Sequence, residues 1–248
     1  PARWTETRTE NMLAMGHGRG QRQRTRMGGT KDGRITAYRL DLLQDNGAYA
    51  RMGGVLPFMT RLMAGGVYDI ANVQFESNSV LTNTTPTVAY RGAGRPEATA
   101  AIERTIDEFA RVAGIDPAEV RRKNYFAPSA FPLVTPMGAK YDSGEYAKAL
   151  DMALEASGYA ELRAEQARRR ATNDPVQIGI GLSSYVETTN PMGSGDYGQV
   201  EITADGGAII RTGSSSHGQG HHTAWAMLVS EATGIPMDKM EFHFGDTD

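Results

Sequence analysis

The sequence predicts an α+β fold made of two mixed α/β lobes, and three observations support this prediction. Stretches typical of strands, alternating or punctuated by glycine, occur at 33–50, 71–83, 176–187 and 197–216. Helical patterns follow one another between these two groups, from residue 95 to residue 174. No repeat appears at the periods of about 20–50 residues that are typical of solenoids. Strands that pair locally and helices that come in runs are typical of α+β proteins.

The first lobe is predicted to contain a hairpin. The stretch at 33–50 alternates from Ile35 to Asp41, as a half-buried strand does. The turn signal Thr30–Gly33 stands directly before it, so we expect this strand to pair with the strand that precedes the turn. A second strand is predicted at 71–83.

Two helices with clear end signals are predicted next. The helix at 95–114 has Pro96 in its first turn and Gly114 at its end. The following helix begins with Asp116 as N-cap and Pro117 at its first position.

A third helix is predicted at 141–159, capped by Asp142 or Ser143 and ended by Gly158. The highly charged stretch at 160–174 is also helical in pattern, and we expect it on the surface, as a linker between the lobes.

After Pro175 the predicted strands are rich in glycine, and the Ala-Asp-Gly-Gly sequence at 204–207 predicts a hairpin turn. A helix beginning near Thr223 and a strand at 238–246 complete the pattern. We therefore divide the chain into a first lobe at 1–160, a helical linker at 161–175 and the start of a second lobe at 176–248.

Composition restricts the chemistry. The net charge of −3 gives no general case for nucleic-acid binding, and the basic run at 16–26 is expected to be a solvated strand or loop surface. The chain contains no cysteine, which excludes disulfides, thiolate metal sites and a cysteine nucleophile. No apolar run approaches the roughly 18 residues that a membrane span needs.

The stretch Ser214–Thr223 places three histidines around Gly218-Gln219-Gly220. The glycines let an anion approach backbone N–H groups at a strand-to-helix turn, so a backbone cradle is the favoured interpretation. Metal binding by His217 and His221 is disfavoured, because Gly-Gln-Gly between them is a poor helix. Purely structural histidines remain an alternative.

The stretch Thr82–Ala98 follows the same plan, because a strand ends, residues 91–95 turn, and Pro96 opens a helix. Arg91 and Arg95 flank small residues there, which suits a phosphate or an oxyanion. A purely structural loop is an equal alternative for this turn.

Taken together, these two loops resemble those of the molybdenum-binding large subunit of the xanthine dehydrogenase and aldehyde oxidase family, in its carbon monoxide dehydrogenase-like branch. Ala89–Glu97 matches that family's Ala-Tyr-Arg-Gly-x-Gly-Arg-Pro-Glu loop, and Gly218–Thr223 matches its Gly-Gln-Gly-His-x-Thr loop. Residues 3–12, 42–50 and 179–187 also have counterparts there.

The resemblance implies two lobes of the molybdopterin-binding domain and a molybdopterin cytosine dinucleotide cofactor carrying molybdenum. The protein would supply no direct ligand to the metal. Gln219 would bond the cofactor near the molybdenum, and Arg91 would approach from the other loop. The implied cofactor-binding residues are Tyr90, Arg91, Gly92, Ala93, Gly218, Gln219, Gly220, His221 and Thr223.

The implied activity is hydroxylation of a C–H group in an aldehyde or an N-heterocycle, with water as the oxygen source. The implied partners are an iron–sulfur small subunit, an FAD-binding medium subunit and a small-molecule substrate, in the cytoplasm and without nucleic acid or a membrane span. A non-catalytic cofactor-binding or structural module is the alternative from another class.

The departures from the family matter as well. Copper-dependent carbon monoxide oxidation is disfavoured, because Gly92-Ala93-Gly94 stands where that branch carries a copper-binding cysteine. Ala93 also lacks the aromatic ring that stacks on purines in the xanthine-type enzymes.

We expect the chain to be part of a longer polypeptide, with the glutamate base beyond Asp248 and a first glycine-rich loop before Pro1. Glu187 is a weaker candidate base, and a carboxylate bound to an arginine or to backbone is the favoured interpretation. Leu182, Ser183 and Tyr185 are candidate residues of the substrate path.

Overall fold

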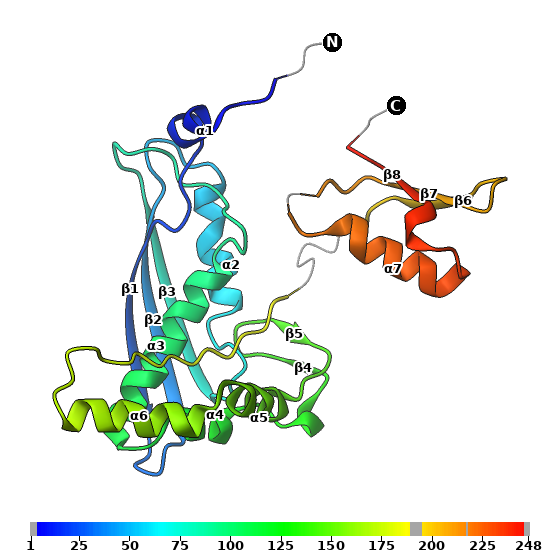
Figure 1. Ribbon diagram of the computed structural model, residues 1–248. Helices are drawn as coiled ribbons and strands as arrows, with labels where there is room; N and C mark the ends of the chain where they lie inside the picture. Colours follow the sequence, from blue (N-terminus) through cyan, green and yellow to red (C-terminus); the bar gives the residue numbers. More distant parts are fainter. Residues whose placement is uncertain (1–3, 189–194, 217, 246–248) are drawn as a thin grey trace. The chain divides into compact units, whose positions relative to one another are not determined.

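The computed structural model describes residues 4–188, 195–216 and 218–245. The chain forms two compact units, Pro1–Thr188 and Thr189–Asp248 (Figure 1). Both units contain helices and strands, so the predicted α+β class is confirmed. The elements of the first unit are α1 (Arg8–Ala14), β1 (Gln21–Gly29), β2 (Ile35–Asp45), η1 (Met52–Val55), α2 (Leu56–Leu62), β3 (Asn72–Val80), α3 (Arg95–Ala113), α4 (Pro117–Asn124), η2 (Pro128–Ala130), β4 (Leu133–Val134), β5 (Lys140–Tyr141), α5 (Tyr146–Ser157) and α6 (Tyr159–Ala171).

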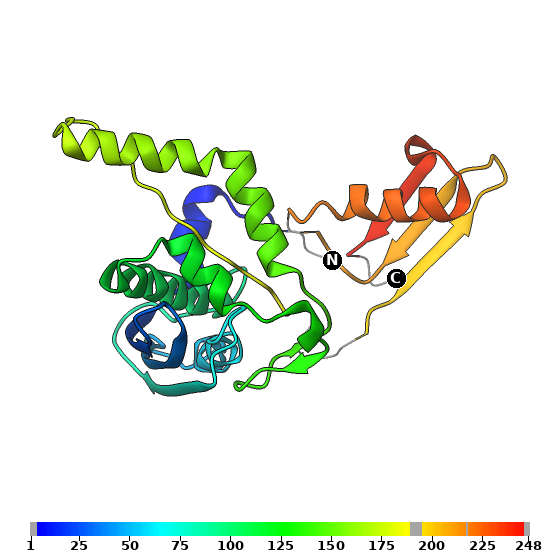
Figure 2. The same cartoon turned by 90° about the horizontal axis from the view of Figure 1, so that it is seen from below.

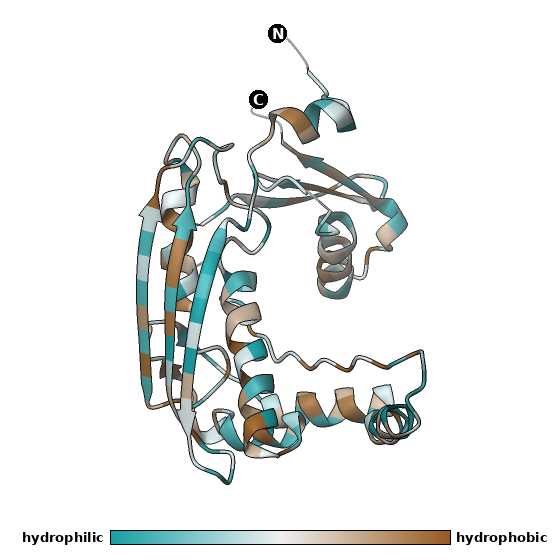
Figure 3. Cartoon of the chain, turned by 90° about the vertical axis from the view of Figure 1, so that its left-hand side faces the viewer, coloured by the Kyte–Doolittle hydropathy of each residue, from teal (hydrophilic) through white to brown (hydrophobic). Residues whose placement is uncertain are grey.

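A three-stranded sheet in the order β1-β2-β3 forms the base of this unit. β1 and β2 form the predicted antiparallel hairpin, whose turn uses Gly33 with φ 91°. β3 lies parallel to β2 after a crossover through η1 and α2. Tyr38, Leu40 and Leu42 of β2 are buried, because alternate side chains of a strand share one face. Figure 3 shows this alternation of hydrophilic and hydrophobic residues along the long strands.

The helix α3 crosses the sheet and covers the buried face (Figure 1). Its predicted end at Gly114 is confirmed, since this glycine is left-handed with φ 70° and donates to Ala110. The predicted cap of α4 is also confirmed, because the side chain of Asp116 accepts a hydrogen bond from the N–H of Ala118. These local signals therefore fix both ends of the turn between α3 and α4.

The predicted cap of α5 is wrong. The helix begins at Tyr146 with Glu145 in the N-cap position, and neither Asp142 nor Ser143 lies close enough to its first turn to cap it. The ring of Tyr146, the first residue of the helix, packs edge-on against Tyr125 and Phe131.

The helix α6 leaves α5 at a sharp bend at Gly158 (Figure 2). Although α6 is highly charged, it packs on the first unit through Gln166, which is buried and donates to the carbonyl of Ile178 at 2.9 Å. The stretch expected to be a linker at 161–175 is therefore packed structure within the first unit. The division between compact units falls after Thr188 instead.

The strand predicted at 176–187 is wrong in the described part of the chain. This segment is extended and follows the first unit, but it joins no strand ladder there. Side chains from the helices hold it instead, because Arg121 donates to the carbonyl of Leu182 at 2.8 Å and Tyr125 bonds to Ser184. Leu182 and Val186 pack against the core.

Arg121 is fully buried and forms the centre of a polar network beneath this segment. Its guanidinium bonds to Glu103 at 2.9 Å and to Asp107 at 2.8 Å, and Tyr68 donates to Glu103 at 2.5 Å. Burial raises the pKa of Glu103, and the neighbouring Arg121 opposes that shift. Removing one partner would leave a buried charge uncompensated, so this network stabilises the arrangement that holds Leu182.

The second unit contains β6 (Gly198–Ile202), β7 (Ala208–Thr212), α7 (His221–Thr233), η3 (Met237–Lys239) and β8 (Met240–Phe244). β6 and β7 form the predicted hairpin, and β8 lies parallel to β7 after the crossover through α7. α7 ends at Gly234, whose φ of 74° is left-handed. Among the described residues, no helix is long and apolar enough to cross a membrane.

Candidate functional site

The loop at 90–94 has an unusual backbone. Gly92, Ala93 and Gly94 have φ values of 92°, 42° and 95°, three left-handed residues in succession. The N–H of Ala93 donates to the carbonyl of Tyr90 at 2.7 Å, and the N–H of Arg95 donates to that of Gly92 at 3.1 Å. Only glycine adopts such values readily, so the chain stores strain at Ala93 and turns tightly before α3.

Gly94 also lies too close to α2 for any side chain. A Cβ atom placed there would lie 2.6 Å from the carbonyl oxygen of Leu56 and 2.9 Å from the nitrogen of Thr60. The loop is therefore fixed against the start of α2, and its exposed part is the side of Tyr90 and Arg91.

The first turn of α3 satisfies most of its own donors. The carboxylate of Glu97 accepts from the N–H of Gly94 at 2.9 Å, and Pro96 has no N–H to offer. An anion at this helix start would therefore find few free N–H groups, in contrast to an uncapped helix.

Arg95 points into the protein. Its Nε donates to the carbonyl of Gly92 at 2.7 Å, and its guanidinium also donates to the carbonyl of Thr188 at 2.9 Å. The same group forms an ion pair with Glu187 at 2.9 Å, and its side chain is only 14% exposed. This geometry fits a structural role for Arg95, with Glu187 as its carboxylate partner.

Arg19 is the residue that the sequence analysis missed. It lies in the basic run, yet its guanidinium forms an ion pair with Glu97 at 2.9 Å and donates to the carbonyl of Arg91 at 2.6 Å. Its Cζ atom also lies 5.2 Å from the centre of the Tyr90 ring. The only signal in the sequence was the pattern of alternate glycines around it, at 16, 18 and 20.

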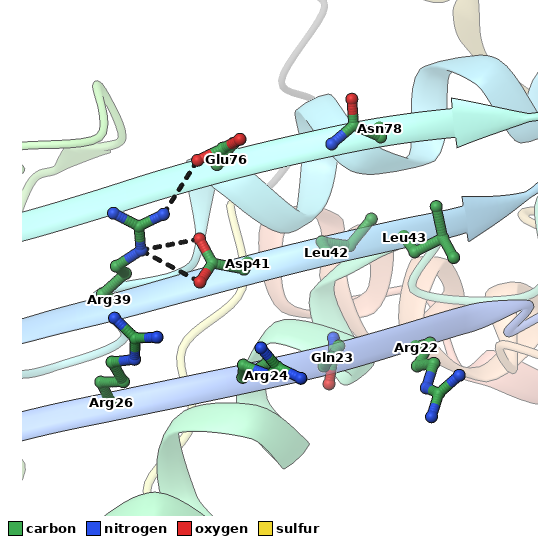
Figure 4. A pocket seen from close by; sticks show the side chains of 10 residues that line it. All are labelled: Arg22, Gln23, Arg24, Arg26, Arg39, Asp41, Leu42, Leu43, Glu76 and Asn78. Atoms are coloured by element: carbon green, nitrogen blue, oxygen red, sulfur yellow. Dashed lines mark hydrogen bonds and ion pairs between the residues drawn. The ribbon is translucent and has the colours of Figure 1, made fainter.

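The other arginines of the basic run behave as expected. Arg22, Arg24 and Arg26 are exposed on one face of β1 and line a shallow groove with Arg39 of β2 (Figure 4). No residue of the two candidate loops lines this groove, so it is not part of the candidate cofactor site.

The second candidate loop leads directly into α7. Gly218 and Gly220 are left-handed, with φ values of 97° and 78°. The helix begins at His221, two residues before the predicted start near Thr223, and Gly220 offers no side-chain cap. The left-handed Gly220 turns the chain straight into the helix, so no additional turn separates them.

The start of α7 keeps an unsatisfied polar atom in the described part of the chain. Gly220 supplies no side-chain cap to the first turn, and the Nδ1 atom of His221 is buried without a hydrogen-bond partner among the described residues. An uncapped helix start with an unsatisfied ring nitrogen suits a polar, anionic ligand.

The two adjacent histidines are engaged by different neighbours. His221 stacks on Trp225 with 4.4 Å between ring centres, and His222 stacks on Phe242 with 4.7 Å. These separate stacking partners do not favour both rings on one metal ion. No group of three metal-binding side chains gathers among the described residues, and His217 lies outside them.

The candidate substrate-path residues alternate along the extended segment. Leu182 faces the core, whereas Ser183, Tyr185 and Glu187 face outward and are exposed. Of these four residues, the structure brings Glu187 to the loop at 90–94, through Arg95. Leu182 is held away from this loop, because its carbonyl accepts a hydrogen bond from Arg121.

The uncapped, glycine-flanked start of α7 is suited to an anionic cofactor, and the loop at 90–94 presents the exposed side chains of Tyr90 and Arg91. The comparisons agree with this class, because residues 1–125 and residues 152–248 each match the molybdopterin cofactor-binding domain. The chain belongs to the molybdopterin-binding domains of the xanthine dehydrogenase, aldehyde oxidase and carbon monoxide dehydrogenase large-subunit family.

Known relatives are similar to this chain in sequence or structure over nearly its whole length. The carbon monoxide dehydrogenase large chain of Hydrogenophaga pseudoflava is 35% identical over all of this chain and 33% of that protein. The nicotine 6-hydroxylase large subunit of Paenarthrobacter nicotinovorans is 30% identical over 99% of this chain and 31% of that protein. Quinoline 2-oxidoreductase from Pseudomonas putida 86 superposes with a TM-score of 0.86 and 30% identity, over 98% of this chain and 32% of that one. The chain thus spans about a third of the length of these relatives.

Proposed function

We propose that the protein carrying this chain is a molybdenum hydroxylase that oxidises a C–H group of an N-heterocycle or an aldehyde, with water as the oxygen source. The single observation that carries the proposal is the occurrence of both cofactor-type loops in one chain of this family. The printed names of two relatives, a nicotine hydroxylase and a quinoline oxidoreductase, favour an N-heterocycle over an aldehyde.

The residues present fit a molybdopterin cofactor, which we propose to be the cytosine dinucleotide form. At the start of α7, the buried Nδ1 of His221 has no hydrogen-bond partner among the described residues, the first turn has no side-chain cap, and nothing lies within 4 Å of a Cβ placed on Gly220. An anionic group can therefore approach this backbone closely. The proposed binding residues are Tyr90, Arg91, Gly92, Ala93, Gly218, Gln219, Gly220, His221 and Thr223.

The side chains of the two loops indicate which roles the protein and the cofactor would have. When bound, the molybdenum cofactor supplies the redox chemistry of the hydroxylation. Gln219 offers two donors and one acceptor for orienting a polar group, and Arg91 adds a planar cation from the first loop. Ser183 and Tyr185 face outward and are proposed to line the substrate path.

Glu187 is assigned a structural role in this proposal. A base needs a free carboxylate within reach of the proton that it removes. The carboxylate of Glu187 is already paired with Arg95 at 2.9 Å, so it is engaged in a contact within the protein.

Copper-dependent carbon monoxide oxidation is the disfavoured alternative, although the relatives include carbon monoxide dehydrogenases. The chain has no cysteine, so it cannot supply a thiolate to copper. For the same reason the iron–sulfur clusters that would accept the electrons must be held elsewhere. We propose an iron–sulfur subunit and an FAD-binding subunit as partners, in the cytoplasm.

The test uses the full-length protein. Molybdenum is measured by mass spectrometry of the metal, and the pterin by its fluorescence and by the nucleotide released on acid hydrolysis. Turnover is then compared for quinoline, an aldehyde and carbon monoxide. Bound molybdenum with turnover of quinoline supports the proposal, whereas protein without pterin supports a non-catalytic module. Turnover of carbon monoxide alone would overturn the substrate assignment. The isolated 248-residue chain is expected to show no hydroxylase activity above a buffer control.

A further inference from the structure

The segment at 16–20 runs alongside the stretch that leads into the loop at 90–94. His17 forms a parallel bridge with Thr87, and the N–H of His17 donates to the carbonyl of Pro86 at 3.2 Å. The N–H of Val88 in turn donates to the carbonyl of His17 at 2.8 Å. The two segments are therefore held backbone to backbone just before the loop.

Alternate glycines make this approach possible. A Cβ placed on Gly16 would lie 2.5 Å from Val88, and one placed on Gly18 would lie 2.5 Å from the Cβ of Tyr90. Any side chain at either position would separate the segments, because contacts below 3.0 Å do not occur for real Cβ atoms. This close packing places the next residue, Arg19, beside the loop at 90–94 and restricts the conformations that its backbone can adopt.

Arg19 itself has an unfavourable backbone conformation. Its φ is 69°, in the left-handed region that a residue with a Cβ rarely adopts. Such outliers persist only where the surrounding structure determines them, and they cluster at functional sites. Here the conformation turns the side chain toward the loop at 90–94.

One guanidinium then holds both ends of the turn. One nitrogen donates to the carbonyl of Arg91 at the start, and another forms an ion pair with Glu97, whose carboxylate also accepts from the N–H of Gly94 at the end. The planar fork of arginine can make both bonds at once, whereas the single ammonium of lysine cannot span them. The ring of Tyr90 lies beside the same guanidinium.

We propose that Arg19 is a positioning residue that sets the backbone of residues 90–94 in its left-handed form before the cofactor binds. The proposal rests on the proposed function, because it takes this loop to contact molybdopterin. A loop already in its bound form loses less conformational freedom on binding, so Arg19 raises cofactor affinity without being required to touch the cofactor.

The test compares Arg19→Ala, Arg19→Lys and the control Arg22→Ala in the full-length protein. Arg22 carries the same charge, lies in the same basic run and is exposed, and its side chain forms no hydrogen bond or ion pair in the described part of the chain. The first measurement is the rate at which pterin is released, taken well below the melting temperature of each variant. The second is hydrogen exchange of residues 86–98 in the cofactor-free protein.

Arg19→Ala is expected to release the cofactor about tenfold faster and to exchange faster in residues 86–98 alone. Arg19→Lys should release the cofactor more slowly than Arg19→Ala but faster than the wild type. Arg22→Ala should match the wild type in both measurements. A merely structural role would lower the melting temperature and raise exchange throughout the first unit. The proposal is overturned if Arg19→Ala releases pterin at the wild-type rate, or if local exchange is unchanged. Wild-type protein that holds no pterin would instead refute the proposed function, and the exchange result alone would then decide whether Arg19 positions the loop.

Discussion

The guanidinium of Arg95 lies 2.9 Å from the carboxylate of Glu187 and also bonds the carbonyl of Thr188. This contact joins the loop at 90–94 to the end of the extended segment at 176–188. It explains why Arg95 faces inward, and it supports the structural role that we propose for Glu187.

Glu187→Gln is therefore expected to leave turnover of the full-length protein within about twofold, because we propose that another group accepts the proton. The side chain of Glu187 is 38% exposed, so losing the ion pair should lower the free energy of unfolding by only about 0.5 kcal/mol. Steady-state kinetics and urea denaturation measure both quantities. A loss of turnover of about a thousandfold, with unchanged stability, would identify Glu187 as the base.

Arg91→Lys and Arg95→Lys should separate function from stability. Arg91→Lys keeps the charge but loses the planar fork, and should lower turnover about tenfold with little change in melting temperature. Arg95→Lys loses bonds to Gly92, Thr188 or Glu187, and should cost about 1–2 kcal/mol with little change in rate. The orientation proposed for this loop would be wrong if Arg95→Lys abolished turnover while Arg91→Lys left it intact.

Gln219→Ala should weaken cofactor retention more than folding. Gln219 is exposed, so removing its amide should change the free energy of unfolding by no more than about 1 kcal/mol. Its orienting bond to the cofactor has no substitute in the proposed site. The measurement is the molybdenum content per protein after gel filtration, beside the melting temperature. Equal molybdenum content and an unchanged rate in the variant and the wild type would argue against the assignment.

Two neighbouring substitutions should act in opposite directions on stability. Ala93 has φ 42°, so Ala93→Gly relieves strain and should stabilise the protein by up to about 1 kcal/mol, less the entropy that glycine costs. Gly94→Ala places a Cβ 2.6 Å from the carbonyl of Leu56 at φ 95° and should cost about 2 kcal/mol or more. Thermal unfolding of both variants checks this. Equal melting temperatures would mean that the backbone at 93–94 differs from the one described.

The pH dependence of stability should include a contribution from Asp32. Lys123 and Thr30 donate to its carboxylate and lower its pKa from 3.8 to about 2. Because the folded pKa lies below the unfolded value, this contribution is present above about pH 4 and is lost as the pH falls toward about 2. Lys123→Gln should move the pKa of Asp32 back toward its ordinary value. An NMR titration of the Asp32 carboxyl group measures this, and an ordinary pKa in the wild type would contradict it.

Sequence patterns predicted the elements whose signals are local. The hairpin turn at Gly33, the end of α3 at Gly114 and the cap of α4 at Asp116 each depend on residues a few positions apart. The two candidate loops were located in the same way, because glycines with left-handed backbone lie just before α3 and α7. The substrate-path and cofactor roles of their residues stay predictions.

Tertiary contacts overrode the local signals elsewhere. Residues 176–187 read as a strand, yet their alternate side chains pack on the core while Arg121 and Tyr125 bond the segment in place of a neighbouring strand. Asp142 and Ser143 are good caps by residue type, but α5 begins beyond their reach at Tyr146, whose ring packs against Phe131.

The sequence alone determined the fold class, most helix ends, the positions of both loops and the absence of thiolate chemistry, because these depend on residue type and short-range spacing. Only the tertiary structure decided which charges meet. Arg19 and Arg95 were equivalent cations in the sequence, and either could have paired with Glu97 or remained in solvent. The segment at 16–20 packs on residues 86–90, and this packing brings Arg19 to Glu97, with which it forms an ion pair. The extended segment that ends at Thr188 brings Glu187 to Arg95, and these two residues form the second ion pair. Ion pairs form between whichever charges distant segments bring within a few ångströms, and no local pattern encodes that distance.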